Sequence, residues 1–218
     1  MVRRRDKSEQ TLAAIVAAGM DIAVHKGLQS VTLNAIALKL NISKSGVFVR
    51  VGSLESLQIL ILDEYERIFA LTVFMPTLSE PAGLPRLNAI VHRWVHHGNE
   101  LTALIASHYA VNTFDDDPEA HPDVLRTRLV NGMLAWRHTI ERTVKQAVEH
   151  GHLRADTDPE QMVFEIFSLL TGFLYDAHVK RDPKCFGRVT LAYERLLSTY
   201  RAFGGSLGPG PGPTGPKP

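Results

Sequence analysis

Apolar residues recur every three to four positions along almost the whole chain, and this spacing restricts the fold more than any other feature. The first such stripe contains Leu12, Ile15, Val16, Gly19 and Ile22. A period of 3.6 residues lines one face of an α-helix, whereas a half-buried strand alternates every second residue. No convincing alternation of that second kind is found, so we expect an all-α fold.

Glycine, asparagine and proline divide this pattern into separate helices. Gly27 and Asn41 each follow an apolar stripe, and both residue types tolerate the left-handed backbone that ends a helix. Ser53 is a suitable N-cap for a long fourth helix. Prolines and glycines between Pro76 and Pro85 interrupt the pattern after that helix.

These boundaries predict three parts of the chain. An N-terminal three-helix domain covers residues 1–52, and a larger helical domain covers residues 53–204. Residues 205–218 are rich in glycine and proline and carry no apolar stripe, so we expect them to be disordered.

The composition of the chain is that of an ordinary globular protein, with 44% hydrophobic and 22% charged residues. Cys185 is the single cysteine, which excludes an intrachain disulfide and suits a reducing cytosol. No run of about 18 uncharged apolar residues occurs, so we expect no membrane span and a cytoplasmic protein.

Charge is distributed unevenly along the chain. The overall formal charge is +1, but residues 1–55 carry eight Lys and Arg against four Asp and Glu. A basic N-terminal part on a mildly acidic remainder indicates a polyanionic partner such as nucleic acid. Small terminal charge excesses are also common in proteins without such a partner, so charge alone leaves the function open.

The segment from Gly27 to Leu57 is the most informative for function. It predicts two short helices, capped by Thr32 and Ser43 and separated by a short turn, which is the arrangement of a helix-turn-helix. We expect the pair to pack on the first helix through Ile36, Ala37, Leu40, Ile42 and Val47. The exposed face of the last helix then presents small, polar and basic groups to a DNA major groove: Lys44, Ser45, Phe48, Val49 and Arg50.

This segment resembles the TetR family of transcriptional regulators. The resemblance lies in Thr32-Leu33 and Ile36-Ala37, then Ile42-Ser43-Lys44-Ser45-Gly46-Val47-Phe48, then Gly52-Ser53-Leu54-Glu55-Ser56-Leu57. It implies that Thr32 and Asn34 meet DNA phosphates and that Lys44, Ser45, Val49 and Arg50 lie at the groove. Ser43 and Phe48 complete the predicted DNA-binding set, with Phe48 where the family often has Tyr.

Three positions depart from the family pattern. Asn41 replaces a usual glycine, which its tolerance of left-handed backbone makes harmless. Arg50-Val51 replaces a usual His-Phe pair and adds a charge at the end of the recognition helix. Leu54 replaces a lysine that commonly contacts a phosphate, and Arg50 is a candidate to compensate.

The resemblance also implies a small-molecule site in the C-terminal domain. We predict that it takes an apolar or amphipathic effector, and the candidate pocket residues are Trp94, His97, His108, Trp136 and Phe173. Core packing is the competing interpretation for most of these aromatic residues.

The last two helices are predicted to join two copies of the chain. The helix at about 159–180 is apolar over a wider arc than one subunit can bury, and the helix at about 184–203 repeats apolar residues at helical spacing. Two such helices from each subunit form a four-helix bundle about a two-fold axis, as the family resemblance also implies. The predicted interface residues are Phe167, Leu170, Leu174, Val189, Tyr193 and Leu196.

Other chemistries are less well supported. His92 and His96 have a spacing that can chelate zinc, with His97 and His108 as possible neighbours, but no further ligand pattern accompanies them, so no metal site is expected. No nucleophile motif, phosphate loop or dinucleotide fingerprint is found, and we expect neither an enzyme nor a cofactor.

Together these patterns predict a homodimer that binds a palindromic double-stranded operator. Repression released by a small molecule is the expected mode of action, while activation, the effector and the operator sequence stay open. The alternative is a helical metal- or ligand-storage protein whose basic N-terminal part is incidental.

Overall fold

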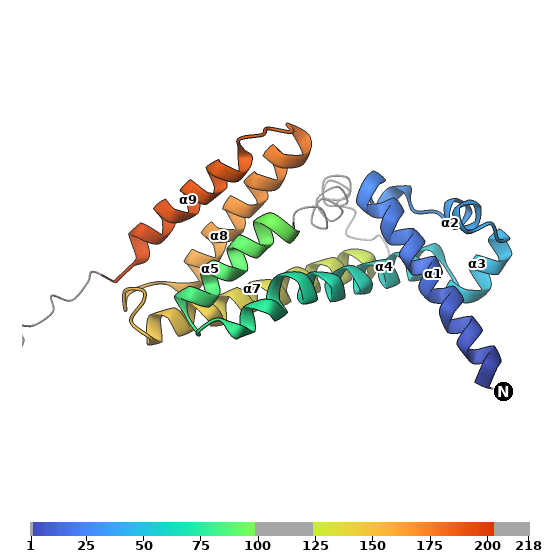
Figure 1. The fold of residues 1–218 in the computed structure, drawn as a ribbon, viewed down its shortest axis with the longest axis horizontal. Coiled ribbons are helices and arrows are strands. Elements are labelled where there is room, and N and C mark those ends of the chain that lie inside the picture. The colour runs from blue at the N-terminus through green and yellow to red at the C-terminus, as the bar shows by residue number, and fades with distance from the viewer. Residues whose placement is uncertain (1, 99–123, 203–218) are drawn as a thin grey trace, which may run out of the picture.

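The computed structural model describes residues 2–98 and 124–202, and these residues form eight α-helices and several short helical turns. They contain no β-strand; Leu153 and Arg201 form one isolated antiparallel bridge. The all-α expectation is therefore confirmed (Figure 1). His108 and the C-terminal residues 205–218 lie outside the described residues.

The head of the molecule consists of α1 (Val2–Lys26), α2 (Leu33–Leu40) and α3 (Lys44–Val51). As expected, α1 ends at Gly27, with φ 82°, and α2 ends at Asn41, with φ 52°. Both residues take the left-handed backbone that turns the chain out of a helix. The sequence signals for these two helix ends are therefore confirmed.

The core of the head joins α1, α2, α3 and the start of α4 (Leu54–Phe69). Ile15, Ile36 and Val47 are fully buried, as the apolar stripes predict. Gly19 on α1 faces the side chain of Ile61 on α4, so the two helices approach closely where a Cβ would clash. The prediction for Ile42 is wrong, because its side chain is 37% exposed in the turn between α2 and α3.

A single helical rod connects the head to the body (Figure 1). It begins with α4 and continues through a π-helical turn, η2 (Ala70–Phe74), and a 3-10 turn, η3 (Met75–Ser79). Pro76 lies in the first turn of η3 and has no N–H to donate, and the Thr72 carbonyl one turn back accepts instead from Arg93 Nε at 2.9 Å. The rod therefore extends past the first proline of the predicted break and ends only before Pro81.

The body packs four further helices around the far half of this rod. They are α5 (Leu84–Arg93), α7 (Val124–Glu149), α8 (Pro159–Leu174) and α9 (Cys185–Tyr200), with short π-helical turns η4 (Trp94–Gly98) and η5 (Tyr175–Val179). In Figure 1, α4 and α7 run side by side, and α8 and α9 form an antiparallel pair above them.

The starts of α8 and α9 are capped differently. The Asp158 carboxylate accepts from the backbone N–H groups of Glu160 and Gln161 and so caps α8. Gln161 itself donates to Glu165 rather than reaching back to the cap. Asp182 accepts from the backbone N–H of Lys184 at 2.9 Å, and α9 begins at Cys185, so this start differs from that of α8.

Aromatic side chains fill the centre of the body. Phe69 lies 5.0 Å from Trp94 and 4.9 Å from Trp136 between ring centroids, and Phe74 stacks on Trp136 at 4.6 Å. Phe167 of α8 meets Trp94 edge to face at 5.3 Å. Such pairs stabilise a core beyond the apolar area they bury, and they tie the rod to α7 and α8.

Among the described residues, no single helix is long and apolar enough to cross a membrane. One bent pair, α3 followed by the rod from Leu54 to Ser79, passes the same length and composition test with a bend of 68° between its two parts.

Candidate DNA-binding surface and effector site

Two hydroxyl side chains fix the helix-turn-helix of the head. Thr32 caps α2 by accepting from the Ala35 N–H at 3.0 Å, and Ser43 caps α3 by accepting from the Gly46 N–H at 3.0 Å. In each case the oxygen accepts, so the Thr32 hydroxyl proton stays available to a phosphate. Ser43 is also hydrogen-bonded to Ser45, with 3.1 Å between the two hydroxyl oxygens.

The predicted DNA-binding residues all lie on the surface of the head. Their side chains are exposed from the start of α2 to the last turn of α3: Thr32, Asn34, Ser43, Lys44, Ser45, Phe48, Val49 and Arg50. Val49 is 79% exposed, which is unusual for an apolar residue in a helix that also has a buried side. The Arg50 guanidinium donates to the Gly46 carbonyl at 3.1 Å and so lies back along α3.

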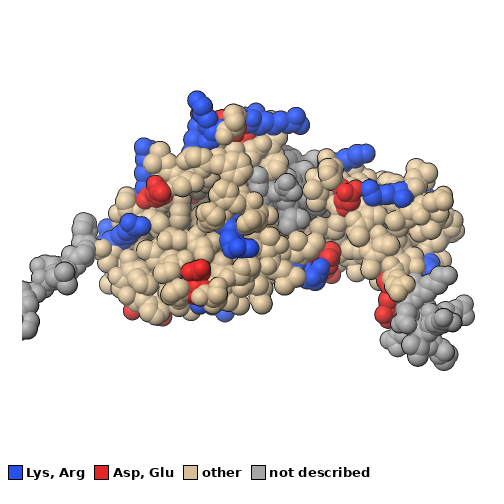
Figure 2. All heavy atoms as spheres, in the orientation of Figure 1, with Lys and Arg blue, Asp and Glu red and all other residues tan. Residues whose placement is uncertain are grey.

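Charge on the head is less one-sided than the sequence count suggests. Figure 2 shows Lys and Arg beside Asp and Glu over the head. Lys39 donates to Asp21 at 2.5 Å, and this hydrogen bond lowers the pKa of the Asp21 carboxyl below its usual range. Among the described residues, no acidic side chain pairs with Lys44 or Arg50, so these two cations remain for a polyanion.

One feature of this surface was missed by the sequence interpretation. Leu38 projects from α2 with 75% of its side chain exposed. Leu38 falls outside the helical spacing of Leu33, Ile36, Ala37 and Leu40, and this offset was the signal that it faces away from α1 and α3. With Ile42, it adds apolar surface to the head.

The predicted effector residues separate into different surroundings. Trp94 and Trp136 lie together in the aromatic core, both in contact with Phe69 and Phe74. Phe173 is buried elsewhere and meets Phe186 of α9 at 5.2 Å, while His97 is exposed. Core packing therefore accounts for much of the aromatic surface.

Trp94 has one unusual property within this core. Its indole Nε1 is buried, and no described residue accepts a hydrogen bond from it. A buried donor without an acceptor costs about 1–3 kcal/mol, so such groups are rare in folded proteins. The N–H of Trp94 is therefore a candidate contact for a polar ligand atom.

The histidines of α5 and η4 form a small cluster. His92 and His96 lie 4.4 Å apart between ring centroids, and His96 stacks on Phe186. Burial lowers the pKa of His96, and the neighbouring His92 and His97 lower it further. Within the described part of the chain, no group of three or more His, Cys, Asp and Glu side chains is placed to hold a metal ion.

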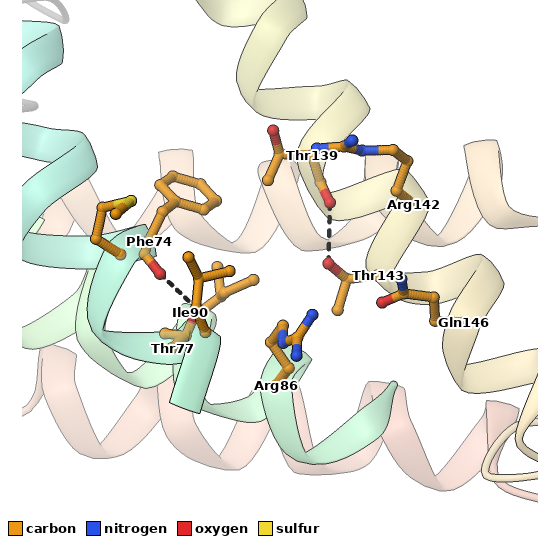
Figure 3. Close-up of a pocket in the computed structure, with 10 residues that line it drawn as sticks. Phe74, Thr77, Arg86, Ile90, Thr139, Arg142, Thr143 and Gln146 are labelled. Carbon is orange, nitrogen blue, oxygen red and sulfur yellow. Dashed lines mark hydrogen bonds between the residues drawn. The ribbon is translucent and has the colours of Figure 1, made fainter. Parts of the chain in front are cut away.

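A cavity of about 300 Å³ opens between η3, α5 and α7. Figure 3 shows side chains from all three elements around it, with the guanidinium groups of Arg86 and Arg142 on its walls. We call it the η3–α5–α7 cavity; its lining residues are Phe74, Met75, Thr77, Leu78, Arg86, Ile90, Thr139, Arg142, Thr143 and Gln146. The sequence interpretation named none of them, because the cavity depends on how three helices meet.

The residues predicted for the subunit interface lie mainly inside the subunit. Leu170, Leu174, Val189 and Tyr193 are buried, and Tyr193 donates to Asn88 of α5 at 3.1 Å. Phe167 and Leu196 are partly buried against the same core. The outward faces carry other apolar residues: Phe164 on α8, Tyr175 on its extension η5, and Leu191 on α9. Phe186 of α9 is only 38% exposed, because it packs against His96 and Phe173.

Comparisons with known proteins agree with this arrangement of head and body. A family model described as a tetracyclin repressor-like C-terminal domain matches residues 83–193, just over half of the chain. No curated protein matches the chain significantly.

Solved structures share the fold over most of their length. A TetR-family transcriptional regulator from Cytophaga hutchinsonii matches with a TM-score of 0.72 and 16% identity, over 90% of this chain and 98% of that one. A putative transcriptional regulator from Saccharomonospora viridis in complex with choline matches with a TM-score of 0.73 and 12% identity, over 88% and 98%. The ketosteroid transcriptional regulator KstR2 of Mycobacterium tuberculosis matches with a TM-score of 0.61 and 13% identity, over 88% and 95%.

The structural likeness shows a common fold, and the family model identifies the body independently of it. The head adds a capped helix-turn-helix joined to that body by one rod. The chain therefore belongs to the TetR family of transcriptional regulators.

Proposed function

We propose that the protein binds a palindromic operator as a homodimer, represses transcription there, and leaves the operator when a small molecule binds its body. The observation that carries this proposal is the exposed face of α3, which is capped by Ser43 and presents Lys44, Val49 and Arg50 without an acidic partner among the described residues. A helix of this kind enters a major groove, where side chains meet base edges.

The surface supports a division of labour between α2 and α3. The start of α2 offers the Thr32 hydroxyl and its first backbone N–H groups, which suit a phosphate oxygen. Lys44 and Arg50 add charge for phosphates or guanine, and Val49 adds apolar surface suited to a thymine methyl group. Phosphate contacts then fix the position of α3, and its exposed side chains supply the sequence preference.

Dimerisation is proposed through the outward faces of α8 and α9. Leu191 is 47% exposed and Phe164 is 56% exposed, so each helix still has apolar surface to bury after the subunit has folded. Gly172 on α8 and Gly187 on α9 have open space around them, which permits close approach of helices from a second copy. A palindrome read by both heads requires the two-fold axis to hold the two α3 helices about 34–36 Å apart, on successive turns of DNA.

Effector binding is proposed to act on the rod between body and head. Trp94 and Trp136 contact Phe69 and Phe74 of the rod, and Trp94 keeps a buried N–H for a ligand acceptor. The choline complex of the Saccharomonospora viridis protein supports a small-molecule site in a body of this fold. A ligand that favours a rod position with wrongly spaced heads weakens operator binding by the coupling free energy, about 1–3 kcal/mol in typical cases.

Selection of bound sites from random double-stranded DNA tests this function directly. We expect a palindromic consensus, and a fluorescent duplex of that sequence should bind with an affinity that falls steeply with salt, since each neutralised phosphate contributes about −0.9 to the slope of log K against log salt. The alternative, a helical storage protein, predicts no enriched sequence. Operator binding also requires access to the chromosome, so the proposed function places the protein in the cytoplasm.

A further inference from the structure

The η3–α5–α7 cavity has the size and lining of a small-molecule site. Its volume of about 300 Å³ lies at the lower end of the range for such sites. Phe74 and Ile90 give it apolar walls, and both are almost completely buried against the body core. The opposite wall, from α7, is polar (Figure 3).

Two arginines supply the charge of this cavity. Arg86 comes from α5 and Arg142 from α7, and no acidic side chain is found among the described residues that line it. Within the described part of the chain, neither guanidinium forms an ion pair with a carboxylate. A wall with two cations and no anion attracts a ligand of negative charge.

Arg86 is poorly satisfied by the protein itself. A guanidinium carries five N–H donors in a fixed fork. One Nη of Arg86 donates to the Glu80 carbonyl at 3.0 Å, whereas its Nε is buried and has no acceptor among the described residues. Figure 3 shows this guanidinium directed toward the space between Ile90 and Thr143. A ligand acceptor that reaches this guanidinium from the cavity supplies a partner that the described residues do not.

The threonine hydroxyls of the cavity are not free to donate hydrogen bonds to a ligand. Thr77, Thr139 and Thr143 each donate their hydroxyl proton to a backbone carbonyl, at 2.7, 3.0 and 2.9 Å. Strong N–H donors therefore remain only on the two arginines and Gln146 among the described lining residues. Such a set suits a group that accepts hydrogen bonds and donates none, as a carboxylate or phosphate does.

We infer that the η3–α5–α7 cavity binds the charged end of an amphipathic organic anion, a carboxylate or phosphate ester, through Arg86 and Arg142, with its apolar part against Phe74 and Ile90. This inference rests on the proposed effector function, names the chemical class of the effector, and assigns it to this cavity, whose lining does not include Trp94. Arg86 lies on the partly buried side, and Arg142 closes the exposed side.

The location of the cavity gives the ligand a direct effect on the rod. Phe74, Met75 and Thr77 of its lining belong to η2 and η3, the end of the rod that begins next to α3. Phe74 also stacks on Trp136, so a ligand that moves Phe74 changes the surroundings of this tryptophan. The anion thereby holds η3 against α5 and α7 in one position.

Calorimetry on the full chain with simple probes tests the ligand class without DNA. We expect octanoate or octyl phosphate to bind at least tenfold more tightly than octanamide, which has the same apolar part without the charge, and than inorganic phosphate, which has charge without the apolar part. Tighter binding of octanoate identifies a carboxylate site, and tighter binding of octyl phosphate identifies a phosphate ester site. Equal binding of octanamide and octanoate, or no binding of either anion, overturns the inference.

Variants of the two arginines locate the site. Arg142→Gln changes an exposed residue and is expected to weaken binding of the preferred probe at least tenfold, with Arg86→Gln acting in the same direction. The matched control is Lys145→Gln, which removes a cation from the same helix outside the cavity and should leave probe affinity within twofold. An unchanged affinity in Arg142→Gln places the anion elsewhere and overturns the assignment.

Operator binding by the ligand-free protein is measured separately. A protein that binds octanoate but no operator contradicts the proposed function and leaves the anion site standing. A protein that binds its operator but neither anion contradicts the anion site alone. Where an anion binds, the change in tryptophan fluorescence on adding it reports whether the ligand reaches the Phe74–Trp136 pair.

Discussion

Short polar side chains at helix ends determine the shape of the head. Thr32, Ser43 and Ser53 each accept a hydrogen bond from a backbone N–H three residues further on. A cap replaced by alanine typically costs about 1 kcal/mol. These positions could be predicted from the sequence because a cap depends on a few neighbouring residues only.

Residues whose role depends on distant packing were harder to predict. Ile42 is apolar and follows a helix, yet it lies partly in solvent because the turn carries it away from α1. Arg86 and Arg142 are 56 positions apart in the numbering, and nothing in either neighbourhood indicates that they share a cavity. Local patterns could therefore name candidate DNA-binding residues on neighbouring positions, but they could not bring Arg86 and Arg142 together.

Arg50 is the residue whose loss should report most directly on DNA recognition. Arg50→Ala is expected to weaken operator binding by about 1–3 kcal/mol if the side chain reads a base, and to relax the preference at one operator position. If Arg50 contacts a phosphate instead, affinity should fall by the same factor for all DNA sequences, and the slope of log K against log salt should become shallower by about 0.9. Anisotropy titrations with the selected operator and single-base variants distinguish the two outcomes.

A body variant controls for the change in net charge. Lys145→Ala removes one positive charge from α7, where Lys145 pairs with Glu141 of the same helix. It should leave operator affinity and salt slope unchanged. Equal losses in both variants would show that net charge, rather than the position of Arg50 on α3, governs binding.

At the scale of elements, one arginine links the rod to the body. Arg128 of α7 donates to Asp63 at 2.6 Å and to Glu66 at 2.6 and 2.7 Å, both on α4. These hydrogen bonds, which Arg128 donates to Glu66 and Asp63, raise the pKa of Arg128 above its ordinary value. Gly132, one turn further along α7, leaves room for the Glu66 carboxylate, which a Cβ at that position would meet.

Loss of this link should loosen the rod. Arg128→Met is expected to reduce the free energy of unfolding by about 1–2 kcal/mol, between the values typical of exposed and buried ion pairs, since Arg128 and Glu66 are only partly exposed. Lys145→Met, which breaks a pair within α7, should cost about 0.5 kcal/mol or less. Urea unfolding of both variants provides the comparison, and equal losses would contradict a special role for the link.

Tyr200 joins α9 to α8 and makes that contact sensitive to high pH. Its hydroxyl donates to Glu165 at 2.8 Å, and burial, followed by this hydrogen bond, raises the pKa of Tyr200 to about 12. The phenol of the unfolded chain ionises near its ordinary value of about 10. The stabilising contribution is therefore complete below pH 10 and is lost as pH rises through 12.

A comparison of melting temperatures tests this pH dependence. The wild type should be more stable than Tyr200→Phe at pH 9, and the difference should shrink steadily between pH 10 and pH 12. Other groups that titrate in this range, such as lysines, are common to both proteins and cancel in the difference. A constant difference across the range would show that Tyr200 does not ionise with unfolding.

Some helix boundaries could be predicted from the sequence and others could not. Helices α1 and α2 end immediately before Gly27 and Asn41, both with positive φ, because backbone conformation there is set by residue type. The start of α9 at Cys185 agrees with the prediction of about 184. The rod through Pro76 was not predicted, because it depends on the short turns η2 and η3, which pack against α5.

For the whole molecule, the sequence predicted the all-α class and the head, and the packing of the body had to come from the structure. The apolar arc of α8 was predicted to be wider than one subunit can bury, but most of it, including Ile166, Leu170 and Leu174, is buried in the subunit, and Phe164 is the residue that lies outward. Periodicity shows how wide the apolar arc of a helix is, but it does not show how much of that arc its own subunit covers.

The dimer is best tested on the outward face of α9. Leu191 is 47% exposed in the subunit, so Leu191→Glu should leave the fold and its melting transition intact while it places a charge in the proposed interface. Sedimentation should then show a folded monomer at concentrations where the wild type is a dimer. Because two heads must act together on a palindrome, operator affinity should fall sharply although Leu191 lies far from α3 in the chain.

Two further variants separate assembly from folding. Leu174→Glu buries a charge in the subunit core and should unfold the protein, as shown by loss of its cooperative melting transition. Leu71→Glu alters a residue of similar exposure, 52%, on the rod, and should preserve the dimer. If Leu191→Glu remains a dimer with full operator affinity, the interface lies on another face. If Leu71→Glu dissociates instead, the two subunits meet through the rod, and the reading heads take a different spacing.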